Sequence, residues 1–230
     1  MQRRPDRPLR PLRVRTLGQV PYATTWESMR AFTQDRRADT DDELWLVEHP
    51  PVYTRGRNAR EPAPPGPIPA VDTDRGGDLT YHGPGQLIAY TLFDLDGLGI
   101  GVRQLVEGLE EAVLTTLASF GISGQRRRGA PGVYVGDAKV ASLGLRIRGG
   151  RSYHGLALNV AMDLGPFNGI APCGYRGLRV TQIADLGGPR DVEVVAAVLI
   201  EAVSVTFRFQ PSREAHGSAC GFTQPVVARP

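Results

Sequence analysis

Cysteine is scarce in this sequence, with only Cys173 and Cys220 among 230 residues. Two cysteines are too few for the disulfide framework of a small secreted domain, and they lack the C-x-x-C spacing of a zinc site. The four histidines stand apart and form no dense cluster with acidic residues. We therefore expect a cytoplasmic protein that holds no metal, in which cysteine chemistry has few places to occur.

Long apolar runs are also missing, since none approaches the roughly eighteen residues that suggest a membrane-spanning helix. The first fifteen residues hold six arginines and one aspartate, but no apolar segment follows that would complete a secretory or twin-arginine signal. The arm has no interleaved aromatic residues, so a solvated tail is a better interpretation than a nucleic-acid-binding arm. We expect no nucleic acid and no membrane as partners, and a monomer.

The apolar pattern predicts a single domain over residues 12–210, between a disordered Arg/Pro-rich arm over 1–11 and a flexible tail over 211–230. Helices are expected at about 21–37, 101–120 and 191–207. Strands are expected at 12–18, 43–48, 52–54, 132–135, 139–148 and 152–162, and around a glycine-rich bend within 71–93. Strands grouped between helices, without steady βαβ alternation, predict an α+β fold.

Cys173 lies between Pro172 and Gly174, in an irregular segment that is typical of a loop. Most cysteines are small buried hydrophobic residues, so this setting is only a hint of reactivity. A thiol becomes a nucleophile as thiolate, and a nearby amine can take its proton. Lys139, upstream, begins an apolar strand. A lysine there is usually a solvated edge residue, but one drawn into a pocket becomes a usable base.

Residues 75–86, Arg-Gly-Gly-Asp-Leu-Thr-Tyr-His-Gly-Pro-Gly-Gln, hold four glycines, which let a backbone approach a ligand closely. The alternative is a hairpin with unusual turns, and His82 alone is more often structural than catalytic. The segment has neither the G-x-x-x-x-G-K-[ST] pattern nor a helix-opening G-x-G-x-x-G pattern, which excludes a Walker-type nucleotide site. Small residues in 139–144 and 154–157 leave room for a ligand beside two strands.

Together these segments resemble the octanoyl-[acyl-carrier-protein]:protein N-octanoyltransferase family, also called lipoyl(octanoyl) transferases or lipoate biosynthesis protein B. The resemblance covers roughly residues 14–205. Its matching segments, in the order of the family, are residues 48–57, 75–86, 132–135, 139–144, 154–159 and 170–174. Gly-Leu-Ala at 155–157 stands where the family more often has Gly-Phe-Ala.

The resemblance implies that Cys173 carries the acyl group as a thioester and that Lys139 lowers the pKa of its thiol. It also implies a mixed sheet flanked by helices, similar to the lipoate/biotin protein ligase (class II synthetase-like) fold. The substrate-binding residues that it implies are Arg75, Gly76, Gly77, Asp78, Leu79, Thr80, Tyr81, His82, Ser142, Leu143, Gly144, Gly155, Leu156 and Ala157.

By the same resemblance, octanoate arrives on the phosphopantetheine of acyl carrier protein, and no further cofactor is expected. The acceptors would be the lipoyl domains of 2-oxoacid dehydrogenase complexes and the glycine cleavage H protein. The run Arg126 to Arg128 is a candidate docking face for the acidic carrier protein, although a solvated loop is the simpler interpretation.

Two alternatives stay open. One is an ATP-dependent lipoate- or biotin-protein ligase, which would share the fold and need no cysteine nucleophile. The other is a non-catalytic module that binds acyl chains or carrier proteins, which would have no need for both Cys173 and Lys139. A free-octanoate and ATP assay separates the first from the transferase, and thiol alkylation kinetics separate the second.

Overall fold

The computed structural model describes residues 8–170 and 178–213. Cys173 and Cys220 therefore lie outside the described residues, as do most of the predicted arm and tail. Among the helices in these two ranges, none is long and apolar enough to cross a bilayer.

The main feature of the fold is an eight-stranded mixed sheet with the order β11-β1-β2-β6-β10-β9-β8-β7. β1 pairs in parallel with β2 and β11, and the remaining neighbours are antiparallel. The strands are β1 (Arg10–Gln19), β2 (Asp42–Glu48), β6 (Gln86–Leu92), β7 (Gln125–Arg126), β8 (Val133–Val135), β9 (Ala138–Arg148), β10 (Arg151–Asn159) and β11 (Phe209–Arg213).

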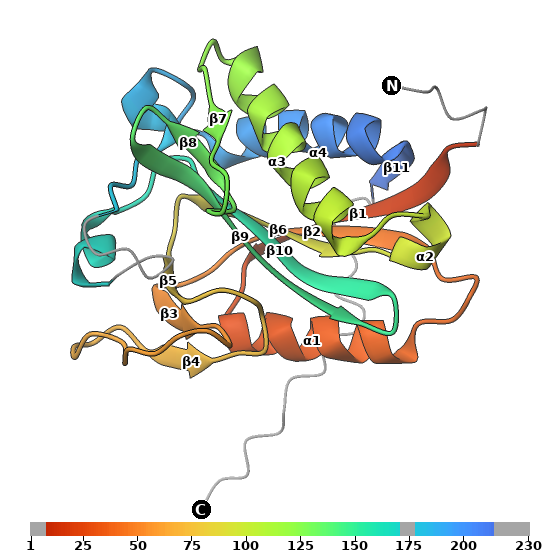
Figure 1. Cartoon of the computed structure of the whole chain (residues 1–230), viewed down its shortest axis with the longest axis horizontal. Helices are drawn as coiled ribbons and strands as arrows, with labels where there is room; N and C mark the ends of the chain where they lie inside the picture. Colours follow the sequence, from red (N-terminus) through yellow and green to blue (C-terminus); the bar gives the residue numbers. More distant parts are fainter. Residues whose placement is uncertain (1–7, 171–177, 214–230) are drawn as a thin grey trace, which may run out of the picture.

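A second, three-stranded sheet lies beside one end of the large sheet (Figure 1). Its order is β4-β3-β5, with β3 (Val52–Arg55), β4 (Ala70–Asp72) and β5 (Leu79–His82). β5 leads through a tight turn at Gly83–Gly85 into β6 of the large sheet. The glycine-rich segment therefore connects the two sheets.

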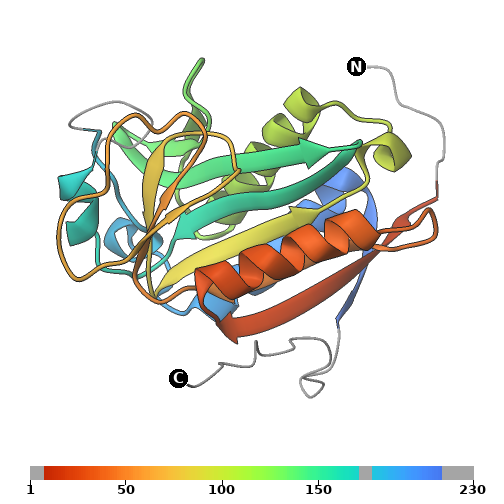
Figure 2. The same cartoon turned by 90° about the horizontal axis from the view of Figure 1, so that it is seen from below.

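Helices cover both faces of the large sheet, which confirms the expected α+β architecture (Figures 1 and 2). α1 (Tyr22–Asp35) lies on one face, and α3 (Val102–Ser119) and α4 (Val192–Phe207) lie side by side on the other. Short turns complete the chain: α2 (Leu95–Leu98), η1 (Gly165–Gly169) and η3 (Ile183–Leu186). α4 begins as predicted, since the Asp191 carboxylate accepts a hydrogen bond from Glu193 N.

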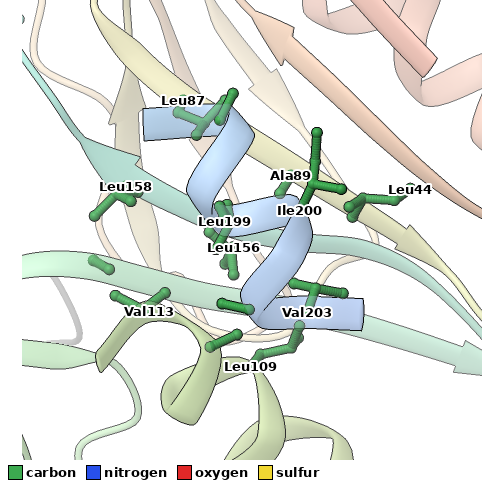
Figure 3. Packing of buried hydrophobic residues seen from close by; sticks show 14 of the residues in the cluster. Leu44, Leu87, Ala89, Leu109, Val113, Leu156, Leu158, Leu199, Ile200 and Val203 are labelled. Atoms are coloured by element: carbon green, nitrogen blue, oxygen red, sulfur yellow. The ribbon is translucent and has the colours of Figure 1, made fainter. Parts of the chain in front are cut away.

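β6 shows how the two faces are divided. All seven of its residues are buried, as expected for a strand covered on both sides. Leu87 and Ala89 join the aliphatic core under α3 and α4 (Figure 3), whereas Ile88, Tyr90 and Leu92 join a second cluster under α1. This alternation follows from the two-residue period of a strand. Tyr90, the aromatic residue of β6, therefore lies on the α1 face.

Pairing in the large sheet extends past residues 12 and 210, the predicted bounds of the domain. Arg10 and Pro11 pair with Phe209 and Gln210, and β11 continues to Arg213. The pairing adds residues of the expected arm and tail to the sheet edge. A five-residue edge strand containing a proline has no alternating apolar pattern, so its sequence carries little strand signal.

Candidate functional site

A cavity opens on the α1 face of the large sheet, between α1, the glycine-rich segment and the strands β6, β9 and β10. The structure brings twelve of the fourteen predicted substrate-binding residues into its wall: Arg75, Gly77, Asp78, Leu79, Thr80, His82, Ser142, Leu143, Gly144, Gly155, Leu156 and Ala157. Three segments that are far apart in the sequence therefore line one space.

Strand register explains why the cavity exists. Across three neighbouring strands, Ser142 lies opposite Ala157, and Ala157 lies opposite Ile88. Two residues further along, Gly144 lies opposite Gly155. Residues two apart in a strand face the same side. The small side chains at these positions leave a trough on the sheet.

The other two predicted residues have different positions. Gly76 N donates a hydrogen bond of 2.8 Å to Leu145 O and ties the glycine-rich segment to β9. The Tyr81 ring packs against Tyr53 and Phe167, in a third apolar cluster. Both residues thus support the wall rather than line the cavity.

Arg75 organises the glycine-rich segment from inside. Its buried guanidinium donates to Thr54 O at 2.6 Å, to Asp78 O at 2.8 Å and to Gly76 O at 2.9 Å. Arginine can do this because its planar group carries five donors. Gly56 lies so close that a Cβ atom there would be 2.2 Å from Gly77 O. The loop conformation depends on both residues.

Sequence reasoning missed an aromatic and histidine cluster at the cavity. His49 Nδ1 lies 2.6 Å from Val20 O, and its Nε2 lies 2.6 Å from the Tyr90 hydroxyl. Burial lowers the pKa of His49 to about 4, so the ring is neutral near pH 7 and Nδ1–H donates to the carbonyl. Burial also raises the pKa of Tyr22, which lines the cavity, to about 12.

His154, also in the cavity wall, has an unusual backbone and a fixed ring. Its φ is +60°, a conformation that non-glycine residues rarely adopt. Its Nε2 lies 3.0 Å from Asp74 Oδ1, and Asp74 also accepts hydrogen bonds from Trp26 and Tyr153. Burial opposes ionisation of Asp74, but hydrogen bonds from His154, Tyr153 and Trp26 lower its pKa below the usual range. Single residues scattered along the chain gave no sequence signal for this arrangement.

Lys139 is buried, with 2% of its surface exposed, and not solvated as an edge lysine would be. Its backbone N–H donates a hydrogen bond to Arg179 O at 2.8 Å, and its backbone carbonyl accepts one from Thr181 N at 2.9 Å. Its Nζ lies 5.3 Å from the centre of the Tyr134 ring. Gly132 leaves space for the side chain, since a Cβ there would lie 2.4 Å from Lys139 Cε.

An irregularity in β9 sets the direction of this lysine. Lys139 and Ser142 are three residues apart, so a regular strand would turn them to opposite faces. The register shifts between β8 and β9, and both Val140 and Ala141 pack into the core under α3 and α4. We infer that this bulge turns Lys139 to the face of the sheet that holds Ser142 and the cavity.

The described chain approaches Cys173 from both sides. Ile170, three residues earlier, is buried against the cluster that contains Phe167. Arg179, six residues later, forms the backbone bond to Lys139. Lys139 and Cys173 are thirty-four positions apart in the sequence. Backbone pairing nevertheless places Lys139 beside Arg179, which follows Cys173 by only six positions.

Two other features bear on the predictions. Arg126 forms ion pairs with Glu110 and Glu111, and Arg127 with Asp137, so two of the three arginines of this run are already engaged with acidic residues. Within residues 8–170 and 178–213, no group of three or more histidine, cysteine, aspartate and glutamate side chains is arranged to hold a metal ion.

Comparison with known proteins gives sequence relatives over most of the chain. The model of the lipoyl protein ligase A/B catalytic domain matches residues 21–204. An octanoyltransferase of Xylella fastidiosa (strain 9a5c) is 54% identical over 198 residues, covering 85% of this chain and 86% of that protein. An octanoyltransferase of Pseudomonas putida (strain W619) is 57% identical over 183 residues, covering 79% and 85%.

Solved structures show the same fold at low sequence identity. Lipoate-protein ligase A bound with ATP has a TM-score of 0.73 at 17% identity, with 90% of each chain covered. Protein Ta0514 from T. acidophilum with bound lipoic acid has a TM-score of 0.71 at 16% identity, with 89% of each covered. Biotin protein ligase from Aquifex aeolicus has a TM-score of 0.55 at 14% identity, covering 85% of this chain and 70% of that one. The predicted lipoate/biotin protein ligase fold is confirmed.

Proposed function

From the premise that this chain belongs to the lipoyl protein ligase A/B catalytic domain family, we propose that it transfers octanoate from acyl carrier protein to the target lysine of lipoyl domains. The chain is an acyltransferase of lipoate biosynthesis, like the octanoyltransferases that it matches at 54% and 57% identity. The finer proposal is that the octanoyl group passes through a thioester on Cys173, with Lys139 as the proton-transfer partner.

The fold by itself does not separate transfer from ligation, because an ATP-bound ligase shares it. Sequence identity above one half with octanoyltransferases, over about four fifths of the chain, favours transfer. The chemistry agrees, since a ligase that forms an adenylate needs no nucleophilic cysteine, and the Pro-Cys-Gly segment supplies one.

The observation that carries the dyad is the backbone pairing of Lys139. A buried lysine held by Arg179 and Thr181 lies beside the segment that begins six residues after Cys173. A thiolate is favoured next to a lysine, and the thiolate is the nucleophilic form of cysteine. The Lys139 Nζ also lies 5.3 Å from the centre of the Tyr134 ring.

In the first step, the Cys173 sulfur attacks the octanoyl carbonyl of the phosphopantetheine thioester. A carbon–sulfur bond forms to Cys173, the bond to phosphopantetheine breaks, and the proton taken up by Lys139 passes to the leaving thiolate. One thioester replaces another, so the free energy changes little.

In the second step, the acceptor lysine amine attacks the Cys173 thioester. A carbon–nitrogen bond forms, the carbon–sulfur bond breaks, and Lys139 removes the proton that the amine loses. The product amide is more stable than a thioester, so this step runs downhill without ATP. The trough floored by Ile88, Ser142 and Ala157 is the proposed binding site for the octanoyl chain during both steps.

The decisive experiment is incubation of the purified protein with octanoyl-acyl carrier protein alone, followed by peptide mass spectrometry. We expect one octanoyl mass on Cys173, none in a Cys173→Ala variant, and normal acylation in a Cys220→Ala control, which removes the other cysteine. Lys139→Ala should slow acylation severely. Near-normal octanoyl transfer by folded Cys173→Ala protein would exclude the thioester mechanism.

The acceptors proposed are lipoyl domains of 2-oxoacid dehydrogenase complexes and the glycine cleavage H protein. Transfer to each isolated domain can be followed by its gain of one octanoyl mass. An assay with free octanoate and ATP, in the absence of acyl carrier protein, tests the ligase alternative directly, since the proposal predicts no product there.

A further inference from the structure

A continuous chain of hydrogen bonds joins the cavity wall to Lys139. Its members are Arg75, Thr54, His82, Gln86, Asn159, Thr181 and Lys139, in that order. Arg75 and His82 line the cavity, whereas Gln86 and Asn159 lie behind them, buried between β5, β6 and β10. The two amide residues have no role in the proposed chemistry so far.

The donor-to-acceptor direction of these hydrogen bonds is fixed at Arg75. The Arg75 guanidinium can only donate, and it donates twice to Thr54 Oγ1, at 3.2 and 2.9 Å. The Thr54 hydroxyl therefore donates its single proton to His82 Nε2, 3.2 Å away. His82 must then carry its own proton on Nδ1, which donates to Gln86 Oε1 at 2.7 Å. Burial lowers the pKa of His82 to about 3, in agreement with a neutral ring.

The same polarity continues through both amides. Gln86 Nε2 donates to Asn159 Oδ1 at 2.9 Å, and Asn159 Nδ2 donates to Thr181 O at 2.9 Å. Thr181 N in turn donates to the Lys139 carbonyl at 2.9 Å. Each amide thus has one orientation that satisfies both of its neighbours. Gln86 and Asn159 have only 1% and 5% of their surfaces exposed, so water offers little replacement.

The two amide residues are themselves rigidly placed. Gln86 begins β6, Asn159 ends β10, and the two are register partners in the sheet. Residues 179–181, to which Asn159 bonds, form no strand of the large sheet. Arg179 and Thr181 form backbone hydrogen bonds to Lys139, and Val180 forms an isolated bridge to it. Asn159 is therefore a side-chain link between the sheet interior and residues 179–181.

We propose that Gln86 and Asn159 are positioning residues that orient Lys139, and the segment paired with it, relative to the acyl cavity. The inference rests on the proposed function of Lys139 as the proton-transfer partner of Cys173. Asn159 reaches the Lys139 backbone through Thr181, and Gln86 reaches it through Asn159 and Thr181. Partners that orient the ligands of metal sites from behind change affinity or activity by about 10-fold to 100-fold when altered, and we expect the lower end of that range here. The effect should appear in turnover rather than in donor binding, because neither amide lines the cavity.

The sharpest variant is Gln86→Glu, which preserves size but changes polarity. A carboxylate at this position still accepts from His82 Nδ1–H, but it cannot donate to Asn159 Oδ1. The Asn159 amide must then turn over to donate to the carboxylate, which brings its oxygen against the Thr181 carbonyl. Asn159→Asp produces the same conflict directly, since a carboxylate cannot donate to Thr181 O.

Ser152→Ala is the matched control. Ser152 is also a buried polar residue of β10, with 1% exposure, and its hydroxyl donates to Thr91 O at 2.7 Å and accepts from Phe93 N at 3.1 Å. These bonds lie at the opposite end of the strand from Asn159 and involve no member of the chain to Lys139.

The experiment measures three quantities in a Cys220→Ala background: thermal stability, steady-state kcat and KM with octanoyl-acyl carrier protein, and the pH dependence of iodoacetamide alkylation at Cys173. We expect Gln86→Glu and Asn159→Asp to lower kcat at least about 10-fold with KM within about twofold, and to displace the alkylation profile toward higher pH. Ser152→Ala should keep kcat and the alkylation profile, whatever its stability.

Wild-type kcat and alkylation profiles in both folded variants would overturn the proposal, and so would failure of both to fold, because their role would then be structural. If only one folds, that variant decides. Cys173→Ala distinguishes this failure from failure of the proposed function. A fully active Cys173→Ala protein refutes the mechanism itself, whereas an inactive one beside normal amide variants refutes only the positioning role.

Discussion

Mild acid should destabilise this protein before its carboxylates are protonated, because two histidines are buried in the neutral form. Burial lowers the pKa of His49 to about 4 and of His82 to about 3, from 6.5 in an unfolded chain. Between pH 6.5 and about 4, the unfolded chain binds protons that the folded protein does not. The stability is therefore complete above pH 6.5 and falls as the pH falls toward the folded pKa values.

The size of the effect follows from these values. At about pH 5, each histidine is about 1.5 pH units below its unfolded pKa, and each unit corresponds to about 1.4 kcal/mol, so the free energy of unfolding should drop by about 2 kcal/mol per ring. The two rings together give about 4 kcal/mol, a large part of the roughly 5–15 kcal/mol typical of folded proteins. Burial also lowers the pKa of His154, which adds in the same direction.

The assay is urea unfolding followed by the fluorescence of Trp26 and Trp45, at several pH values between about 7.5 and 5. His49 and His82 together should contribute a slope approaching two protons at the acidic end, to which His154 adds. His49→Asn is the matched variant, since its amide can still donate to Val20 O but does not titrate. It should lower stability at neutral pH and remove about one proton from the slope.

A flat stability profile from about pH 7.5 to 5 would refute the reasoning, as would native-state histidine titrations by NMR with pKa values near 6.5 for His49 and His82. Asp74 does not contribute to the change expected in this window. Asp74 has a pKa held below its usual range, so the stability that it contributes is lost only at lower pH.

Three further predictions concern the site itself. Ala157→Val should fill part of the trough and lower kcat/KM for octanoyl relative to hexanoyl donors by about 10-fold. The reason is that about two methylenes of the octanoyl chain, each worth about 0.8 kcal/mol when buried, would no longer be buried there. An unchanged ratio of the two kcat/KM values would show that the trough does not bind the acyl chain. Gly132→Ala should impair acylation by displacing Lys139 Cε, whereas Gly129→Ala, also at positive φ but with open space around it, should cost only stability. Arg75→Lys should lower the melting temperature and raise KM for the donor, because an ammonium cannot make all the fork-shaped contacts to the loop carbonyls; an unchanged KM would exclude the loop from donor binding.

The regular elements could be predicted because each carries its own period. The expected helix at 101–120 is α3 (Val102–Ser119), and the expected strand at 139–148 is β9 (Ala138–Arg148). In both, apolar residues recur where one face meets the core. β11 had no such pattern and was missed, because its sequence offers one apolar core residue, Phe209, and the strand is otherwise recognisable only by its pairing with β1 at the sheet edge.

The aromatic cluster illustrates a second limit. Tyr22 lies in α1, His49 directly after β2 and Tyr90 in β6, and each alone looks like an ordinary residue of its segment. Their meeting at one cavity depends on how α1 lies against the sheet (Figure 2). Motif reasoning found the glycine-rich wall, whose residues are adjacent in sequence, and missed the wall that only packing assembles.

Lys139 shows both what sequence reasoning can find and what it misses. Resemblance to a family singled it out, but its local sequence predicts an exposed strand end. Three nonlocal features overturn that expectation: the bulge that turns it, Gly132 that leaves it space, and the 179–181 backbone that covers it. The last of these follows Cys173 in the chain. The backbone pairing that covers the lysine therefore also fixes residues 179–181, so a change that breaks this pairing should expose Lys139 and release these residues together.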